Sequence, residues 1–175
     1  MYQHVTTITK RSSITRYFFL SVVALIATSP LNRVVADEPI LLSIHGNIEG
    51  AANKVIGLNL EKLTSLEATT IVTTAPWTDG PMQYTGVRIN KLLESVGAKS
   101  SQFEASAAND YRFKLTDIDF EKYPILIAYK KNGELLDIRN LGPLMIVFPF
   151  DDFPELLTER NKAASVWQLI KIEIL

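Results

Sequence analysis

Short apolar segments separated by turn residues fill the second half of this chain, and this pattern limits the possible fold more than any other feature. The strongest turn signal is Asn132-Gly133, because both central residues of a type I′ turn need positive φ angles. It lies between two predicted strands, Ile125–Lys130 and Glu134–Ile138. The pair predicts a β-hairpin, and therefore at least one sheet with antiparallel strands.

The other segments predict a mixture of strands and short helices. Helical spacing of apolar residues predicts helices at Leu58–Leu66, at Val87–Val96 with Gly97 as its C-terminal stop, and at Pro154–Lys162. Mixed strands with two or three short helices define an α+β fold, here a compact mixed β-sheet domain. The remaining predicted strands are Ile40–Ile44, Ala68–Thr74, Gln102–Ala107, Tyr111–Leu115, Leu144–Phe148 and Ser165–Ile174.

The N-terminal segment reads as a secretory signal. Basic residues precede the apolar run Tyr17–Ala27, a helix breaker follows at Pro30, and Val34-Val35-Ala36 supplies a cleavage site with small residues. We therefore expect a signal peptide at 1–36 and an exported domain at 37–175. The alternative is an uncleaved membrane anchor, for which the apolar run is short.

Charge and composition narrow the class of protein. The chain has 175 residues and is 47% hydrophobic, which suits one domain with a buried core rather than a disordered protein. Beyond residue 36 there are 14 basic and 19 acidic side chains, a net charge of −5. An acidic body disfavours nucleic acid as a partner, so a small ligand or another protein is expected.

Few residues offer catalytic or metal-binding chemistry. The chain has no cysteine, which excludes thiolate metal ligands and disulfides, and its two histidines are His4 and His45. His4 would leave with the signal peptide, and a lone His45 in a strand is expected to be structural. Asp151-Asp152 with Glu155 lacks EF-hand spacing and is interpreted as a solvated loop. The residues alone identify no catalyst.

Two loops combine an aromatic ring with a carboxylate. Trp77-Thr78-Asp79-Gly80 lies between prolines, and Asn109-Asp110-Tyr111 lies between two predicted strands. Such loops can present a flat ring beside an anionic hydrogen-bond acceptor. The alternative interpretation is structural: Trp77 fills the core, and the Asp-Gly and Asn-Asp pairs only make turns.

The order of these segments resembles a known family. The stretch Thr73–Gly97, TTAPWTDGPMQYTGVRINKLLESVG, resembles the W-x-G-V-x-L-x-x-L-L-x-x-x-G segment of the sulfite oxidase-type molybdopterin-binding fold. The later segments follow in the family's order, and the resemblance covers most of Ile40–Leu175. They are Ala108-Asn109-Asp110-Tyr111, Ile127-Ala128-Tyr129 with Asn132-Gly133, Gly142-Pro143-Leu144 with Pro149, and Trp167.

The sequence departs from the family where the metal would bind. Catalytic members carry a metal-ligating cysteine at the position that Thr73 or Thr74 occupies here, and a hydroxyl replaces a soft thiolate poorly. Met145 stands in place of the family's Arg, and Gln168 in place of its Lys. Loss of the thiolate and of both cations argues against molybdenum as a cofactor.

The resemblance then implies a periplasmic protein that binds a reduced pterin without catalysis and relays pterin status to the periplasmic domain of a membrane-bound cyclic-di-GMP enzyme. Trp77 is the expected platform for the ring, and Asp79 or Asp110 the acceptor at the ring edge. Two alternatives stay open, a molybdenum-cofactor oxidoreductase that uses Thr73 or Thr74, and an interaction module without a ligand. The expected supporting hydrogen-bonding residues are Thr73, Thr74, Asn109 and Tyr111.

Overall fold

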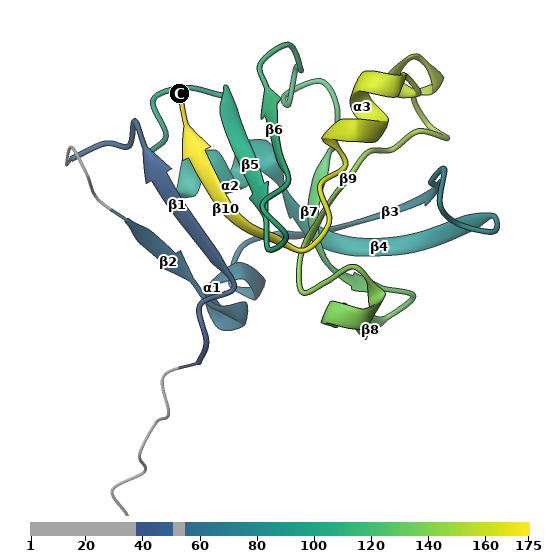
Figure 1. The fold of residues 1–175 in the computed structure, drawn as a ribbon, viewed down its shortest axis with the longest axis horizontal. Coiled ribbons are helices and arrows are strands. Elements are labelled where there is room, and N and C mark those ends of the chain that lie inside the picture. The colour runs from purple at the N-terminus through teal and green to yellow at the C-terminus, as the bar shows by residue number, and fades with distance from the viewer. Residues whose placement is uncertain (1–37, 51–54) are drawn as a thin grey trace, which may run out of the picture. The chain divides into compact units, whose positions relative to one another are not determined.

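Two sheets, one mixed and one antiparallel, organise the part of the chain that the structure, a computed structural model, describes, namely residues 38–50 and 55–175 (Figure 1). The segment predicted as a signal peptide, residues 1–36, lies outside the described residues. Within the described ranges, no helix has the length and apolar character needed to cross a membrane.

The first sheet places the C-terminal strand at its centre. Strand β10 pairs in parallel with β1 on one side and antiparallel with β5 on the other, so segments from both ends of the described chain lie side by side. In spatial order the strands are β2 (Ile56–Leu58), β1 (Leu42–Gly46), β10 (Leu169–Ile174), β5 (Phe103–Ala107) and β6 (Arg112–Leu115).

The second sheet is built around a long hairpin that projects from the sheet in Figure 1. Strands β3 and β4 pair over seven residue pairs, from Ala68 opposite Val87 to Thr74 opposite Pro81. The register between β4 and β7 shifts at Thr85/Gly86, where Tyr129 is an extra residue on the β7 side. The strands are β3 (Ala68–Thr74), β4 (Pro81–Arg88), β7 (Leu126–Lys131) and β8 (Glu134–Leu135), with β9 (Met145–Val147) also pairing with β7.

The helices are short, and side chains cap the first residues of α1 and α3. Asn59 accepts a hydrogen bond from the Lys62 amide at the start of α1, and Thr158 accepts one from the Asn161 amide at the start of α3. At the end of α2, Gly97 has φ +68°, the left-handed conformation that glycine adopts readily. The helices are α1 (Leu60–Thr64), α2 (Ile89–Ser95) and α3 (Glu159–Ala164), with 3₁₀ turns at Ile138–Asn140 and Pro154–Leu156.

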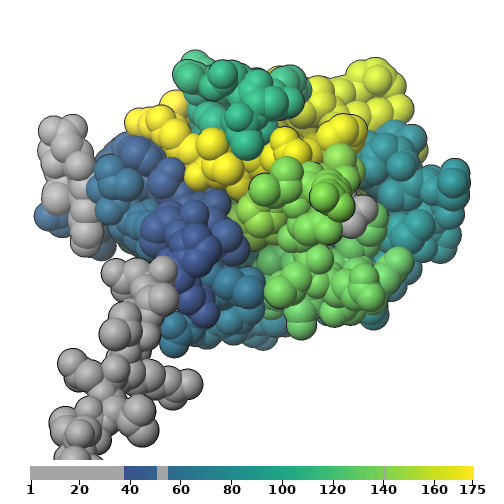
Figure 2. All heavy atoms as spheres, turned by 60° about the horizontal axis from the view of Figure 1, so that its bottom comes forward, coloured from purple at the N-terminus to yellow at the C-terminus, as the bar shows by residue number. Residues whose placement is uncertain are grey.

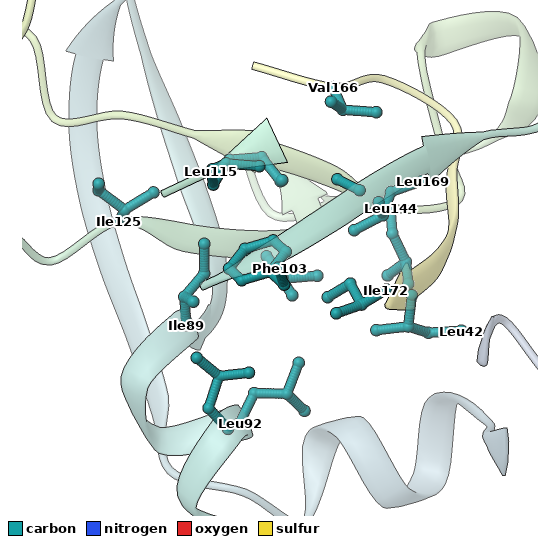
Figure 3. Packing of buried hydrophobic residues seen from close by; sticks show 14 of the residues in the cluster. Leu42, Ile89, Leu92, Phe103, Leu115, Ile125, Leu144, Val166, Leu169 and Ile172 are labelled. Atoms are coloured by element: carbon teal, nitrogen blue, oxygen red, sulfur yellow. The ribbon is translucent and has the colours of Figure 1, made fainter. Parts of the chain in front are cut away.

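The main core lies between the first sheet, helix α2 and the strands of the second sheet. Figure 3 shows Ile89 and Leu92 of α2 directed toward Phe103 of β5. Phe103, Ile172 and Leu42 are all fully buried on the same sheet. Alternate residues of β1 and β5 face this core, as the period of two in their sequences requires. A second cluster around Tyr84 and Leu126 lies on the other face of the hairpin sheet.

The predicted α+β class is confirmed, but several element boundaries were wrong. Leu58 belongs to β2, and Asn59 caps the helix that follows. Of the helix predicted at Leu58–Leu66, only Leu60–Thr64 is helical, as α1. The strand predicted at Glu134–Ile138 ends after Leu135, since a 3₁₀ turn follows. Within Pro154–Lys162, Thr158 separates a 3₁₀ turn from α3.

Other boundaries moved by a few residues. The predicted strand Ile40–Ile44 lies at 42–46, and Tyr111 is left outside β6 by the preceding turn. Val87 is in a strand rather than in the helix predicted from it, and Ser165 precedes the closing strand, which starts at Leu169. The predicted turn at Asn132-Gly133 is confirmed, with φ +51° and +86°.

Candidate functional site

The loop between β5 and β6 is held by its own side chain and by the start of β10. The Tyr111 amide donates to Asn109 Oδ1 at 3.1 Å, and Asp110 takes the left-handed φ of +65° that an Asx-type turn accommodates. The Ala108 amide donates to the Gln168 carbonyl at 2.9 Å. This bond fixes the loop beside the segment that carries Trp167.

A pocket of about 300 Å³ opens beside this loop. The phenol of Tyr111 donates to the Ala163 carbonyl of α3 at 3.0 Å, which joins the loop to the helix across the pocket wall. Tyr111 and Trp167 remain 42% and 39% exposed, so each offers ring surface to a ligand. The lining residues are Ala107, Asn109, Tyr111, Lys162, Ala163, Ser165 and Trp167.

Trp77 lies behind Trp167. The two indole rings meet edge to face, with centroids 5.1 Å apart and planes at 67°. Trp77 also packs against the second core cluster, and its indole nitrogen is buried without a hydrogen-bond partner. Trp77 therefore contacts the ring that lines the pocket, but it is not a lining residue itself.

The two carboxylates predicted to contact the ring edge lie outside the pocket lining. Asp79 is exposed in the turn between β3 and β4, and Asp110 is exposed in the β5–β6 loop. Of the predicted residues, Asn109 and Tyr111 line the pocket. The amide group of Asn109 uses its oxygen for the Tyr111 amide, which leaves its nitrogen as the group able to donate to a ligand.

Thr73 and Thr74 are engaged with Asp151 rather than with the pocket. The Thr74 amide and hydroxyl both donate to Asp151 Oδ2, at 2.8 and 3.0 Å. The Asp151 amide donates to the fully buried Thr73 hydroxyl at 3.3 Å. Asp151, interpreted from sequence as part of a solvated loop, is exposed in a turn and also holds the end of β3 through these bonds.

We expect Asp151→Ala to lower the free energy of unfolding by about 1 kcal/mol, because the Thr74 amide and hydroxyl lose a charged acceptor. Equilibrium urea denaturation measures the change. Asp152→Ala is the matched control, since its exposed side chain makes no bond in the described structure. Equal stability of the two variants would contradict this role for Asp151.

The two positions at which the resembled family has a cation, Met145 and Gln168 here, are uncharged in this chain. Met145 is 1% exposed and belongs to the second core cluster. The side-chain amide of Gln168 donates to the Ile138 carbonyl at 3.1 Å. Figure 2 shows the yellow C-terminal segment beside the green segment that contains this carbonyl.

Sequence reasoning missed most of the pocket wall that α3 and the following residues provide. Lys162, Ala163 and Ser165 carry no motif, and only the fold brings them to the β5–β6 loop. Trp167 could have been identified as a candidate, because it is an aromatic residue at the start of the predicted closing strand. In the structure its ring is partly exposed and can contact a ligand. Lys162, the charged lining residue, is paired with Glu159 at 2.7 Å.

The described residues contain no group of three histidine, aspartate or glutamate side chains able to hold a metal ion. The side chains of the whole sequence also lack the thiolate ligands that a soft metal prefers. The hydroxyls of Thr73 and Thr74 are both bonded to Asp151. The residues at the expected metal position therefore do not fit molybdenum.

Comparisons with known proteins support the fold. The two sheets and short helices define an α+β domain that agrees with the sulfite oxidase-type fold expected from the sequence. Among solved structures, the chain is similar to the sulfane dehydrogenase SoxCD from Paracoccus pantotrophus, with a TM-score of 0.54 and 21% identity. The match covers 76% of this chain and 37% of that chain. No family model and no curated protein matches this sequence.

Proposed function

We propose that this chain is a non-catalytic pterin-binding protein, and that its ligand occupies the pocket between the β5–β6 loop and α3. The observation that carries the proposal is the pocket of about 300 Å³ lined by two exposed aromatic rings and one free amide donor. A volume of this size suits a flat bicyclic ring rather than a long chain or a macromolecule. The similarity in fold to a molybdopterin-type domain gives this ligand class its support.

Three lining residues, Trp167, Asn109 and Tyr111, would hold the ring, and Trp77 would support one of them. Trp167 offers an indole face for stacking, and Trp77 behind it fixes the orientation of that indole by edge-to-face contact. The Asn109 amide nitrogen donates to the ring carbonyl. Tyr111, whose hydroxyl is already bonded to Ala163, closes the side of the pocket with its ring. Binding by stacking and a few hydrogen bonds corresponds to a Kd of about 1 μM, or about −8 kcal/mol.

Molybdenum chemistry has no part in the proposal, because the residues at the expected metal position do not fit the metal. Thr73 is buried under the Asp151 amide, and Thr74 donates to the Asp151 carboxylate. The alternative, an oxidoreductase that uses either hydroxyl as a ligand, requires that hydroxyl to give up its bond to Asp151. Its test is elemental analysis of protein made in a host that synthesises the cofactor. About one molybdenum atom per chain would establish the alternative.

The wider role is part of the same proposal. The basic and apolar N-terminal segment supports export, and the family resemblance supports a periplasmic location and a relay of pterin status to a membrane-bound cyclic-di-GMP enzyme. The net charge of −5 beyond residue 36 favours a protein partner over nucleic acid. A pull-down with the periplasmic domain of such an enzyme, with and without pterin, tests this role. Equal recovery in both conditions would refute the relay.

The pterin itself is tested by anaerobic calorimetric titration of the purified protein with tetrahydrobiopterin. We expect saturable binding of one ligand per chain with a Kd of about 1 μM. Adenine is a matched control, since it is a flat bicycle that lacks the pterin carbonyl. Absence of heat with tetrahydrobiopterin at two temperatures, or equal affinity for adenine, would overturn the proposal. The ligand-free interaction module would then be the better interpretation.

A further inference from the structure

Strand β3 forms an open edge of the second sheet. It pairs with β4 on one side, and no strand in residues 38–50 or 55–175 pairs with its other side. Its sequence, ATTIVTT, has seven residues and no charge. A long uncharged edge is uncommon, because such strands pair readily with other chains.

The other sheet edges are protected in the usual ways. Strand β2 has three residues and β8 has two, so neither offers a long ladder. Strand β6 carries two cations, Arg112 and Lys114. Among the strands at the ends of the two sheets, β3 alone combines length with the absence of charge.

The register identifies which groups of β3 face outward. Gln83 of β4 bonds through both its amide and its carbonyl to Asn132, on the side away from β3. The direction of the backbone N–H and C=O groups alternates along a strand, so those of Tyr84 point toward β3, where its partner is Ile71. The residues on either side of Ile71, namely Thr70 and Val72, therefore direct their N–H and C=O groups away from β4.

Asp151 closes one end of this edge. The Thr74 amide also faces outward, and it is bonded to the Asp151 carboxylate. The outward groups of Ala68, Thr70 and Val72 have no bond to any other backbone group in the described residues. These three residues are exposed, and the Val72 side chain is 52% accessible. The free part of the edge is thus centred on Thr70.

We propose that this edge pairs with the same edge of a second copy of the chain. An antiparallel arrangement with Thr70 opposite the second copy's Thr70 uses every free group and leaves Thr74 with Asp151. Ala68 then lies opposite the second copy's Val72, and the pairing forms about six backbone hydrogen bonds. The hairpin sheets of the two copies become one continuous sheet.

The chemistry of the edge favours a second copy over an unrelated strand. A two-fold axis through Thr70 places small and β-branched side chains opposite each other on both faces. Along the strand the nearest charged residue is Glu67, which falls opposite the uncharged Thr73 of the second copy. The inference goes beyond the proposed function, because it involves neither the pocket nor a pterin.

Sedimentation velocity of the purified protein from about 1 to about 100 μM tests the pairing. We expect a concentration-dependent dimer for the unmodified chain. Thr70→Lys places two ammonium groups across the axis, and Thr70→Pro removes an outward N–H while leaving the β3–β4 ladder intact. Both should raise the dimer dissociation constant by about tenfold or more.

Thr85→Lys is the matched control. Thr85 of β4 lies opposite Thr70, and their two hydroxyls share one hydrogen bond of 2.9 Å. Each lysine variant therefore loses that bond and adds the same charge to the same face of the sheet. Only the variant at Thr70 places the charge at the edge. A monomeric unmodified chain, or equal dimerisation of the Thr70→Lys and Thr85→Lys variants, would overturn the proposal.

Cross-linking tests the register. The chain has no cysteine, so Thr70→Cys and Val72→Cys each introduce a single thiol. Under mild oxidation Thr70→Cys should form a disulfide-linked dimer much faster than Val72→Cys, because only residue 70 lies opposite itself. Faster cross-linking of Val72→Cys would contradict this register. Pterin titration of the Thr70→Lys variant separates the two proposals, since the monomer should bind pterin with unchanged affinity.

Discussion

Trp167→Ala should weaken tetrahydrobiopterin binding by about tenfold to a hundredfold, since stacking of one aromatic ring contributes about 1–3 kcal/mol. The side chain lines the pocket and keeps 39% of its surface exposed, so its loss removes ring contact and leaves the surrounding strands in place. Calorimetric titration measures the Kd, and a thermal melt followed by circular dichroism verifies that the variant is folded.

Three further variants make the result specific to the ring. Trp167→Phe should recover most of the affinity, because a phenyl ring still stacks. Trp77→Ala should have a smaller effect, because Trp77 contacts Trp167 and is not a lining residue. Ile170→Ala, at an exposed position outside the lining, should leave the Kd unchanged. Unchanged affinity in Trp167→Ala would place the pterin site elsewhere.

Gly86→Ala should lower the free energy of unfolding by about 3 kcal/mol through overpacking. A Cβ atom at this position would lie 2.2 Å from the Ile127 carbonyl oxygen and 2.6 Å from the Ala128 Cα. Both atoms belong to the backbone of β7, so the strands must separate to make room. The position coincides with the register shift between β4 and β7.

Gly80→Ala is the comparison for this variant. A Cβ at Gly80 meets no atom within 4 Å, and the cost there comes only from its φ of +90°. We expect a loss of about 1 kcal/mol for this variant, measured by the same equilibrium denaturation. If Gly86→Ala were as stable as Gly80→Ala, the close approach of β4 and β7 would not limit this position.

The hairpin of β3 and β4 shows where sequence reasoning succeeded and where it failed. The β-branched run Ala68–Thr74 was predicted as a strand with the bounds that the structure has. Its partner, Pro81–Arg88, was missed because Pro81 and Gly86 are both typical of turns. Proline is tolerated as the first strand residue, and the glycine is required where β7 approaches.

The candidate site was predictable only in part, for a similar reason. Asn109 and Tyr111 lie in a loop that local turn chemistry identifies, and both line the pocket. The opposite wall comes from α3, more than 50 residues further along the chain, as the Tyr111–Ala163 bond shows with its separation of 52 residues. No local pattern reports such a contact. That Trp167 lines the pocket and Trp77 lies behind it likewise depends on tertiary packing.

The central place of β10 has a consequence for the order in which the first sheet forms. Ser43 of β1 bonds to Ile170 across 127 residues of chain, and β10 follows every other described element in the sequence. The first sheet therefore cannot close until β10 has joined β1 and β5, and loop closure over such a separation is slow. Until then the first sheet exists only as two separate strand pairs, β1 with β2 and β5 with β6.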